Sequence, residues 1–221
     1  MTKYIAIDGD GVLFDYNKAA ANLYESLYNE KLKEVHPKAY NFDVQYDLQQ
    51  SSEPQFKSKM YSLFDKHEVW GKMPAIEGAL EATRLMKEKG YTLVCLTSMP
   101  PRYQYLRHQN ALNLGYPIDH VVAVDRRQSR LQGIENPKKQ WILDNKPVAF
   151  IDDLLINFLD MADIKDTQLV WLDNQHCNNK NPNDIYDKNQ VHTITNSLMD
   201  FAKTLPQYNN LPEYTTKSLR K

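Results

Sequence analysis

The chain has 221 residues, of which 42% are hydrophobic, so it can bury a substantial core in one domain with an insertion or in two small domains. Its 27 basic and 28 acidic side chains give a formal net charge of -1, which removes the simplest electrostatic argument for a nucleic-acid or membrane-surface partner. No apolar run approaches the roughly 18 residues of a membrane span. We therefore expect a small substrate, no nucleic acid and no membrane.

Short apolar runs recur along the chain, and stretches of helical periodicity lie between them. A helix is predicted over residues 76–90, where alanine, leucine and methionine follow helical spacing and Gly90 provides a C-terminal stop. Runs without polar alternation are typical of strands that are buried on both faces. The predicted strands are residues 3–7, 91–97, 120–124, 147–152, 168–173 and 190–195.

This alternation of strands and helices predicts an α/β fold, in which a doubly wound parallel sheet is covered by helices. In such a fold, ligands collect outside the carboxyl ends of the strands. Asp8, Thr97 and Asp152 all lie at such predicted ends. The sequence therefore predicts a functional site at this edge of the sheet.

Residues 16–73 interrupt the alternation, because no convincing buried strand lies between the first strand and the helix that begins at Ile76. Apolar residues at helical spacing over 17–28 and 54–64 predict a small helical cap instead. We therefore divide the chain into an α/β core, a cap and a polar, Asn-rich tail. The predicted bounds are residues 1–15 and 74–205 for the core, 16–73 for the cap and 206–221 for the tail.

The two cysteines indicate a reduced, cytoplasmic protein. Cys95 lies inside an apolar run and Cys177 in a polar stretch, so they neither form a disulfide framework nor have the spacing of a zinc site. No basic-then-apolar signal segment precedes Tyr4. Next to Cys177, His176 adds only a second isolated metal ligand, which favours a surface loop over a metal site.

The stretch Asp8-Gly9-Asp10-Gly11 places two carboxylates two residues apart where a strand ends. Asp and Gly are poor strand formers, and the two glycines allow the backbone to turn tightly and to approach a ligand closely. Asp-Gly pairs are also ordinary turn formers, so this stretch alone is compatible with a plain loop. The same spacing suits a pair in which one carboxylate attacks while the other manages a proton.

With three signals further along the chain, this stretch resembles the haloacid dehalogenase (HAD) superfamily of phosphatases over residues 3–160. The resemblance implies a HAD-like Rossmannoid core and makes Asp8 the nucleophile and Asp10 the general acid and base. It also implies that a hydroxyl at the end of the second strand binds phosphate, where this sequence has Thr97-Ser98. A phosphate-binding lysine is expected at Lys138 or Lys139, and spacing alone does not decide between them.

The fourth strand of the resemblance ends in acidic residues, here Asp152-Asp153 followed by Asn157. Because several carboxylates and a phosphate cannot share one site unaided, we expect a Mg²⁺ ion, which prefers oxygen ligands. The expected ligands are the Asp8 carboxylate, the Asp10 backbone carbonyl and the Asp152 carboxylate. Asp153 and Asn157 are expected to orient this set.

Two features depart from the common pattern of the superfamily. Gly9 stands where a bulky apolar residue is usual, and we expect it to loosen the packing behind Asp8. The lysine pair also lies only some fourteen residues before Asp152, which predicts a short intervening helix.

These residues predict a Mg²⁺-dependent phosphatase that hydrolyses a small phosphorylated metabolite through an aspartyl phosphate. Four alternatives stay open: a 5′(3′)-deoxyribonucleotidase-like nucleotide phosphatase, a phosphotransferase or mutase, a metal-independent 2-haloacid dehalogenase, and a non-catalytic phosphate-binding module. The aromatic residues of the cap suit a stacked nucleobase, but aromatic residues at helical spacing more often build a core.

Overall fold

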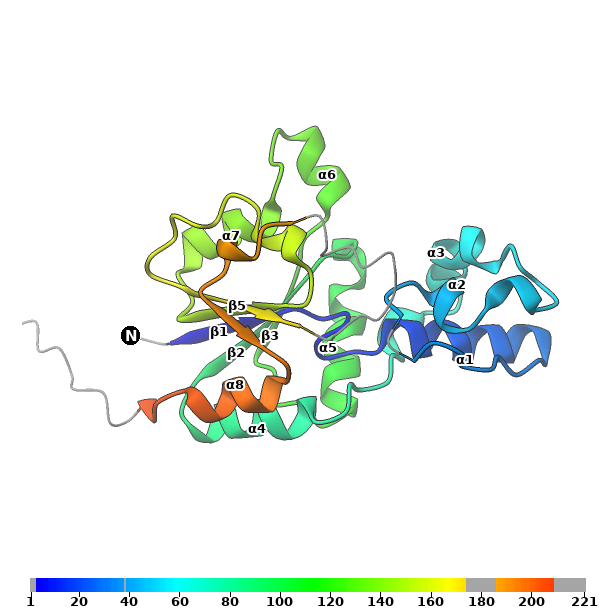
Figure 1. The fold of residues 1–221 in the computed structure, drawn as a ribbon, viewed down its shortest axis with the longest axis horizontal. Coiled ribbons are helices and arrows are strands. Elements are labelled where there is room, and N and C mark those ends of the chain that lie inside the picture. Colours follow the sequence, from blue (N-terminus) through cyan, green and yellow to red (C-terminus); the bar gives the residue numbers. More distant parts are fainter. Residues whose placement is uncertain (1–2, 38, 174–185, 209–221) are drawn as a thin grey trace, which may run out of the picture.

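A computed structural model describes residues 3–37, 39–173 and 186–208, and its centre is a six-stranded parallel sheet (Figure 1). The strand order is β3-β2-β1-β4-β5-β6, so the chain winds outward from β1 in both directions. The strands are β1 (Tyr4–Ile7), β2 (Thr92–Thr97), β3 (His120–Ala123), β4 (Ala149–Asp152), β5 (Gln168–Leu172) and β6 (Thr193–Thr195). The predicted doubly wound α/β fold is therefore confirmed.

Alternate residues of the central strands pack on opposite faces of the sheet. In β1, Ile5 and Ile7 belong to one buried apolar cluster, while Ala6 belongs to a second cluster across the sheet. In β4, Ile151 and Phe150 divide in the same way. Since both faces are apolar, the strands read as continuous hydrophobic runs, which is the pattern of a doubly covered parallel sheet.

Helices cover both of these faces. In Figure 1, α4 and α8 lie on one side of the sheet and α7 lies on the other. The helices of the core are α4 (Ala79–Glu88), α5 (Gln104–Asn113), α6 (Arg126–Leu131), α7 (Pro137–Asn145) and α8 (Leu198–Thr204), with short 3₁₀ turns η3 (Pro101–Tyr103), η4 (Leu155–Phe158) and η5 (Lys188–Gln190). Nowhere in the described ranges does a helix combine the length and apolar character that a membrane span requires.

The segment between β1 and α4 is helical and lies beyond the carboxyl end of β1 (Figure 1). It contains α1 (Tyr16–Tyr28), α2 (Phe42–Gln45), η1 (Leu48–Gln50), α3 (Phe56–Lys66) and η2 (Val69–Gly71). The chain leaves and returns at one place, since the Asp15 N–H donates to the Pro74 carbonyl at 2.9 Å and the Ile76 N–H donates to the Leu13 carbonyl at 3.0 Å. The Asp15 side chain also caps α1 by accepting the Lys18 N–H at 2.8 Å.

Most of the aromatic residues in this segment pack against one another. The ring of Phe56 lies 5.3 Å from that of Tyr24 and 5.8 Å from that of Phe42, and all three residues are buried. Tyr61 differs, because 66% of its surface is exposed. These contacts show that the helical spacing of the aromatic residues mainly builds a core.

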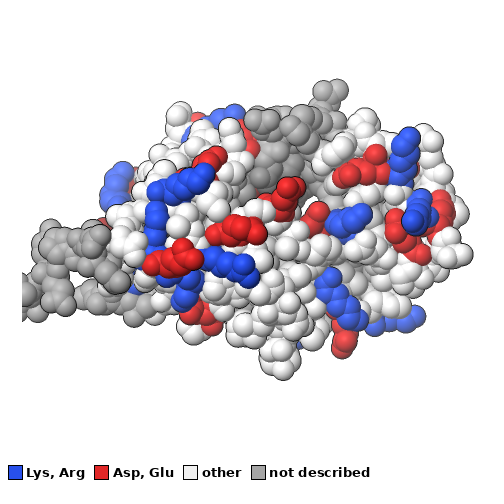
Figure 2. Space-filling view, turned by 90° about the horizontal axis from the view of Figure 1, so that it is seen from below, with Lys and Arg blue, Asp and Glu red and all other residues white. Residues whose placement is uncertain are grey.

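The first residues of the predicted tail lie against α4. The Tyr208 N–H donates to the Lys89 carbonyl at 2.8 Å, and Gln207 Nε2 donates to the Glu88 carbonyl at 3.0 Å. The rest of the tail, residues 209–221, and the pair His176–Cys177 lie outside the described residues. On the face drawn in Figure 2, acidic and basic side chains are interspersed, in agreement with the nearly balanced charge of the chain.

Candidate active site

Three carboxylates meet where β1 and β4 end. The strands pair in parallel with Ile7 opposite Ile151, so the residues that follow, Asp8 and Asp152, are neighbours, and the Asp8 N–H donates to the Ile151 carbonyl at 2.9 Å. Carboxylate oxygens of Asp8, Asp152 and Asp153 lie within 4.8 Å of one another, and all three residues are buried. The sheet thus brings together two acidic segments that are more than 140 residues apart in the sequence.

Lys138 supplies a positive charge to this cluster. Its Nζ lies 2.8 Å from Asp8 Oδ1 and 2.7 Å from Asp152 Oδ2, and its side chain is only 1% exposed. Asn136 caps α7 by accepting the Lys139 N–H at 3.1 Å, which places Lys138 in the first turn of the helix. Lys139 is half-buried in the same turn, so the structure brings Lys138 rather than Lys139 to the carboxylates.

Asp152 is held from several sides. Asn157 Nδ2 lies 2.7 Å from both carboxylate oxygens of Asp152, and the Leu154 N–H donates to Oδ1 at 2.9 Å. Asn157 is held in turn, because Asn136 Nδ2 donates to its carbonyl at 3.1 Å. The predicted orienting role of Asn157 thus corresponds to a direct contact with Asp152.

Burial and mutual charge shift the pKa values of the groups in this cluster. Desolvation, together with the negative charge of Asp152 and against the opposing effect of Lys138, raises the pKa of Asp8 to about 7. Desolvation and the charges of Asp152 and Asp8 also raise the pKa of Asp153 well above its ordinary value. Burial acts against the charge of Lys138, but Asp152 and Asp8 outweigh it and raise the lysine pKa above its usual value.

Three buried carboxylates face one buried lysine, and this imbalance of charge fits a cation. The site offers only oxygen ligands at close spacing, which is the donor set that Mg²⁺ prefers. Two of the three predicted metal ligands, Asp8 and Asp152, belong to the cluster through their side chains. Its third side chain is that of Asp153, which was predicted to orient the ligands, while Asp10 was predicted to contribute its backbone carbonyl.

Thr97 and Gly9 fit closely against each other. A Cβ on Gly9 would lie 2.7 Å from Thr97 Oγ1, which is closer than side chains tolerate, and 3.0 Å from Thr97 Cβ, which is a tight contact. The expectation that Gly9 loosens the packing behind Asp8 is therefore wrong, because the side chain of Thr97 fills that space. Thr97 Oγ1 is buried and makes no hydrogen bond to any described residue, while the neighbouring Ser98 is exposed.

Asp10 faces an arginine that the sequence analysis did not single out. The guanidinium NH2 of Arg107 lies 2.8 Å from Asp10 Oδ1, and the arginine side chain is fully buried. Arg107 lies three and four residues before the buried Asn110 and Ala111 of α5. The signal in the sequence was thus a charged residue on the buried face of a helix.

Two tyrosines of the segment between β1 and α4, Tyr16 and Tyr40, have raised pKa values. Burial raises the pKa of Tyr40, and the negative charges of Asp153, Asp152 and Asp8 raise it further. Burial, Tyr61 and Asp10 raise the pKa of Tyr16 in the same way. Both phenols are therefore expected to stay protonated.

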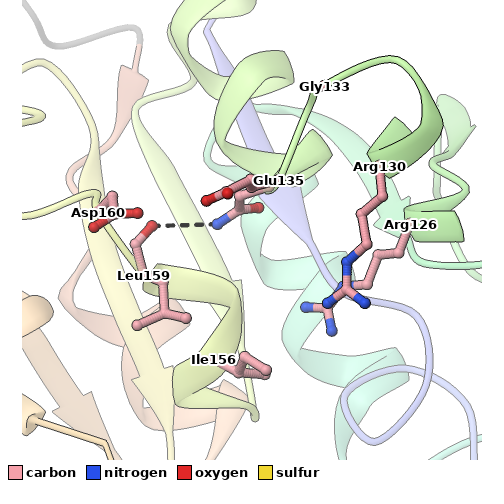
Figure 3. Close-up of a pocket in the computed structure, with 8 residues that line it drawn as sticks. Arg126, Arg130, Gly133, Glu135, Ile156, Leu159 and Asp160 are labelled. Carbon is pink, nitrogen blue, oxygen red and sulfur yellow. Dashed lines mark hydrogen bonds between the residues drawn. The ribbon is translucent and has the colours of Figure 1, made fainter. Parts of the chain in front are cut away.

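A separate pocket of about 560 Å³ is lined by residues of α6 and η4, among others (Figure 3). Arg126 and Arg130 extend into it from α6, and Glu135 and Asp160 also line it. Its wall includes Asn136, which donates to the Asn157 and Leu159 carbonyls and so connects the pocket to the residues that hold Asp152. Two guanidinium groups and two carboxylates balance in charge, so this pocket does not select an ion of one sign.

Comparison with known proteins finds similarity in three-dimensional structure. No protein-family model matches this chain, and no curated protein matches it either. Among solved structures, a defluorinating L-2-haloacid dehalogenase is similar, with 13% identity, 92% of this chain and 95% of that chain covered, and a TM-score of 0.57. A haloacid dehalogenase-like hydrolase from Streptococcus pneumoniae has 12% identity over 91% of this chain and 97% of its own, with a TM-score of 0.55.

A HAD-superfamily hydrolase of subfamily IA from Geobacter sulfurreducens PCA is also similar, with 15% identity, 93% and 100% of the two chains covered, and a TM-score of 0.50. At these identities the similarity concerns the fold. The chain therefore has the fold of the haloacid dehalogenase superfamily.

Proposed function

We propose that this chain is a Mg²⁺-dependent phosphatase that acts on a small phosphorylated metabolite. The observation that carries the proposal is the buried cluster of Asp8, Asp152 and Asp153 around Lys138. A hydrolase that uses only an aspartate nucleophile has no need of two further buried carboxylates, which are costly to ionise there. Binding of a divalent cation by the carboxylates and of an anionic substrate by the lysine would account for this cluster.

Asp8 is the proposed nucleophile. The Gly9 N–H and Lys138 Nζ both contact Oδ1, at 2.7 and 2.8 Å, so the carboxylate is fixed and Oδ2 is the oxygen proposed to attack phosphorus. A bond forms between Oδ2 and phosphorus while the bond from phosphorus to the ester oxygen breaks. The product of this step is an aspartyl phosphate on Asp8 and a leaving alkoxide.

Asp10 is the proposed proton donor and acceptor. It gives a proton to the leaving alkoxide and then takes a proton from the water that attacks the phosphorus of the aspartyl phosphate. The side chain of Asp10 is 27% exposed, so it can reach both the alcohol and the water. Asp8 is regenerated as a carboxylate when phosphate leaves.

Lys138 and Thr97 are proposed to hold the phosphate oxygens. The lysine provides charge, and the buried Thr97 Oγ1 has no hydrogen-bond partner among the described residues, so it can donate to a phosphate oxygen. A bound Mg²⁺ would neutralise the carboxylates and stabilise the charge on the transferring phosphoryl group. Asp8 and Asp152, with Asp153 or the Asp10 carbonyl, are the groups that would hold it.

The helical segment over the carboxylates is proposed to select the substrate. Besides burial, the negative charges of Asp153, Asp152 and Asp8 raise the pKa of Tyr40, and that of Asp10 contributes to the raised pKa of Tyr16, which supports a place for both phenols near the site. The other buried rings of the segment pack against one another, so they are not the surface on which a ligand would stack. We therefore favour a small, polar phosphate ester over a nucleotide.

A screen for phosphate release tests the proposal. Sugar phosphates, nucleotides and p-nitrophenyl phosphate are incubated with the protein with and without Mg²⁺, and the Asp8→Asn variant serves as the control. We expect release that requires both Mg²⁺ and Asp8. Chloride release from L-2-haloacids without Mg²⁺, or phosphate release by Asp8→Asn at the wild-type rate, would contradict the proposal.

A further inference from the structure

Arg107 is a buried cation whose hydrogen-bonding capacity is unused. None of its surface is exposed, and its Nε, NH1 and NH2 atoms make no hydrogen bond within the described part of the chain. Buried polar groups are nearly always hydrogen-bonded, so a guanidinium of this kind requires a specific reason. The reason must lie in the groups that surround it.

The charged group that contacts Arg107 is Asp10. NH2 of Arg107 lies 2.8 Å from Asp10 Oδ1, and neither atom forms a hydrogen bond to the described residues, so the contact is an ion pair without hydrogen-bond geometry. Asp10 is partly exposed while Arg107 is fully buried. The carboxylate therefore has one side toward the site and one side toward the guanidinium.

Aromatic rings hold the guanidinium in place. Its central carbon lies 4.5 Å from the ring centroid of Phe14 and 5.7 Å from that of Trp70. Trp70 is itself fixed, because its Nε1 donates to Asp65 Oδ1 at 3.1 Å. These rings keep water away and favour the cation through their π-electrons, so Arg107 offers Asp10 a rigid positive partner.

We propose that Arg107 is a positioning residue, which holds the Asp10 carboxylate in the orientation needed to pass a proton to the leaving oxygen. This inference rests on the proposed function, because it assigns a partner to the proton donor of that reaction. Direct binding of substrate by Arg107 is not favoured, since its surface is fully buried, whereas the side chain of Asp10, which it contacts, is partly exposed. Arg107 acts through Asp10.

The basicity of the leaving group provides a readout that a purely structural role would not change. Benzyl phosphate and p-nitrophenyl phosphate are similar in size, but the benzyl alkoxide requires a proton to leave, whereas nitrophenolate leaves without one. The ratio kcat/KM reports the steps up to the first bond cleavage. Misplacing Asp10 should therefore lower kcat/KM for benzyl phosphate much more than for p-nitrophenyl phosphate.

The experiment compares Arg107→Met, Arg107→Lys, Asp10→Asn and the double variant Asp10→Asn/Arg107→Met with the wild type in saturating Mg²⁺. Loss of a general acid typically costs about 10²- to 10⁴-fold, and we expect Asp10→Asn to show this loss on benzyl phosphate. Arg107→Met should lose about 10²-fold on the same ester, as expected for a group misplaced by about 1 Å. The double variant should lose no more than Asp10→Asn.

Two further variants cover the case in which Arg107→Met does not fold and control for the loss of an arginine elsewhere. Arg107→Lys keeps a charge in a different shape, so it should fold if Arg107→Met does not, and it should lose activity selectively on benzyl phosphate. Arg84→Met, the control, removes an arginine that is exposed on α4. This variant should leave kcat/KM unchanged for both esters.

The outcomes separate this inference from the proposed function. If Arg107→Met and Arg107→Lys lower kcat/KM for both esters by the same factor, or if the effect of Arg107→Met is undiminished in the Asp10→Asn background, the inference is wrong although the phosphatase proposal stands. If the wild type releases phosphate from none of the esters, those of the screen included, the proposed function is wrong and the inference falls with it. Selective loss on benzyl phosphate without further loss in the double variant supports both.

Discussion

Replacing Lys138 by Met removes the ammonium group that lies 2.8 Å from Asp8 Oδ1 and 2.7 Å from Asp152 Oδ2, while it keeps most of the apolar stem. Removing one partner of a buried ion pair typically costs about 3–5 kcal/mol, because the other partner is left as an uncompensated charge. We expect a loss of this size in the free energy of unfolding of the metal-free protein at pH 8.

The loss should depend on pH. Without the lysine, the pKa of Asp8 rises above its already raised value of about 7, so its carboxylate is protonated in the folded variant at pH 5. Stability gained from a raised carboxylate pKa is present at low pH and is lost as the pH rises through that pKa. Because Lys138 also pairs with Asp152, the deficit of Lys138→Met should persist at pH 5 but be smaller there than at pH 8.

Urea unfolding followed by circular dichroism at both pH values measures this difference. Lys139→Met is the matched control, because Lys139 is half-buried in the same helical turn, and we expect its free energy of unfolding to stay within about 0.5 kcal/mol of the wild type. Equal deficits for Lys138→Met at pH 5 and pH 8 would refute the reasoning, as would an equal loss in Lys139→Met.

Three further predictions concern neighbouring residues. Because the folded-state pKa of Asp8 is raised from 3.8 to about 7, metal-free Asp8→Asn should become more stable than the wild type as the pH rises from 4 to 8, by on the order of 4 kcal/mol, and saturating Mg²⁺ should abolish this advantage in thermal unfolding scans. Gly9→Ala should lower stability by about 1–3 kcal/mol in urea, and adding Thr97→Ala, which removes Oγ1 but keeps Cβ, should recover part of it; a Gly9→Ala protein as stable as the wild type would show that the space is open. Asn136→Ala loses the cap of α7 and two side-chain bonds, so calorimetry should show a loss of about 1–2 kcal/mol, and an unchanged melting temperature would contradict the assigned role.

The sheet was predictable because each strand is a continuous apolar run between segments of helical spacing. The ends of the helices and strands were less predictable. The helix predicted over 76–90 begins only at Ala79, since Gly78 has a φ of +76° and cannot belong to it. The strand predicted over 190–195 is confined to β6 (Thr193–Thr195), because a 3₁₀ turn extends through Gln190.

The candidate site was predictable where its chemistry lies in short motifs. Asp8, Thr97 and Asp152 were found because each follows or ends an apolar run, and parallel strands bring such ends to one edge. Whether Lys138 or Lys139 reaches the carboxylates depends on how α7 is rotated about its axis over β4, which the local sequence does not encode. Arg107 was missed because its partner, Asp10, is almost 100 residues away and the contact exists only once α5 has packed.

The cap, as a division of the chain, stays a prediction. The helices lie where periodicity placed them, and the two crossings of the chain are joined by the Asp15–Pro74 hydrogen bond. Tyr16 and Tyr40 could not be separated from the other aromatic residues of the segment, because their burial and the charges that act on them depend on tertiary packing.

The central claim is that Asp8 becomes phosphorylated during turnover. The most direct measurement is rapid acid quenching of the protein during hydrolysis of p-nitrophenyl phosphate in Mg²⁺, followed by peptide mass spectrometry. We predict a phosphoryl group on Asp8, formed within the first turnover and absent from Asp8→Asn. Steady hydrolysis with no phosphoryl group on Asp8, or with the group on another residue, would contradict the account.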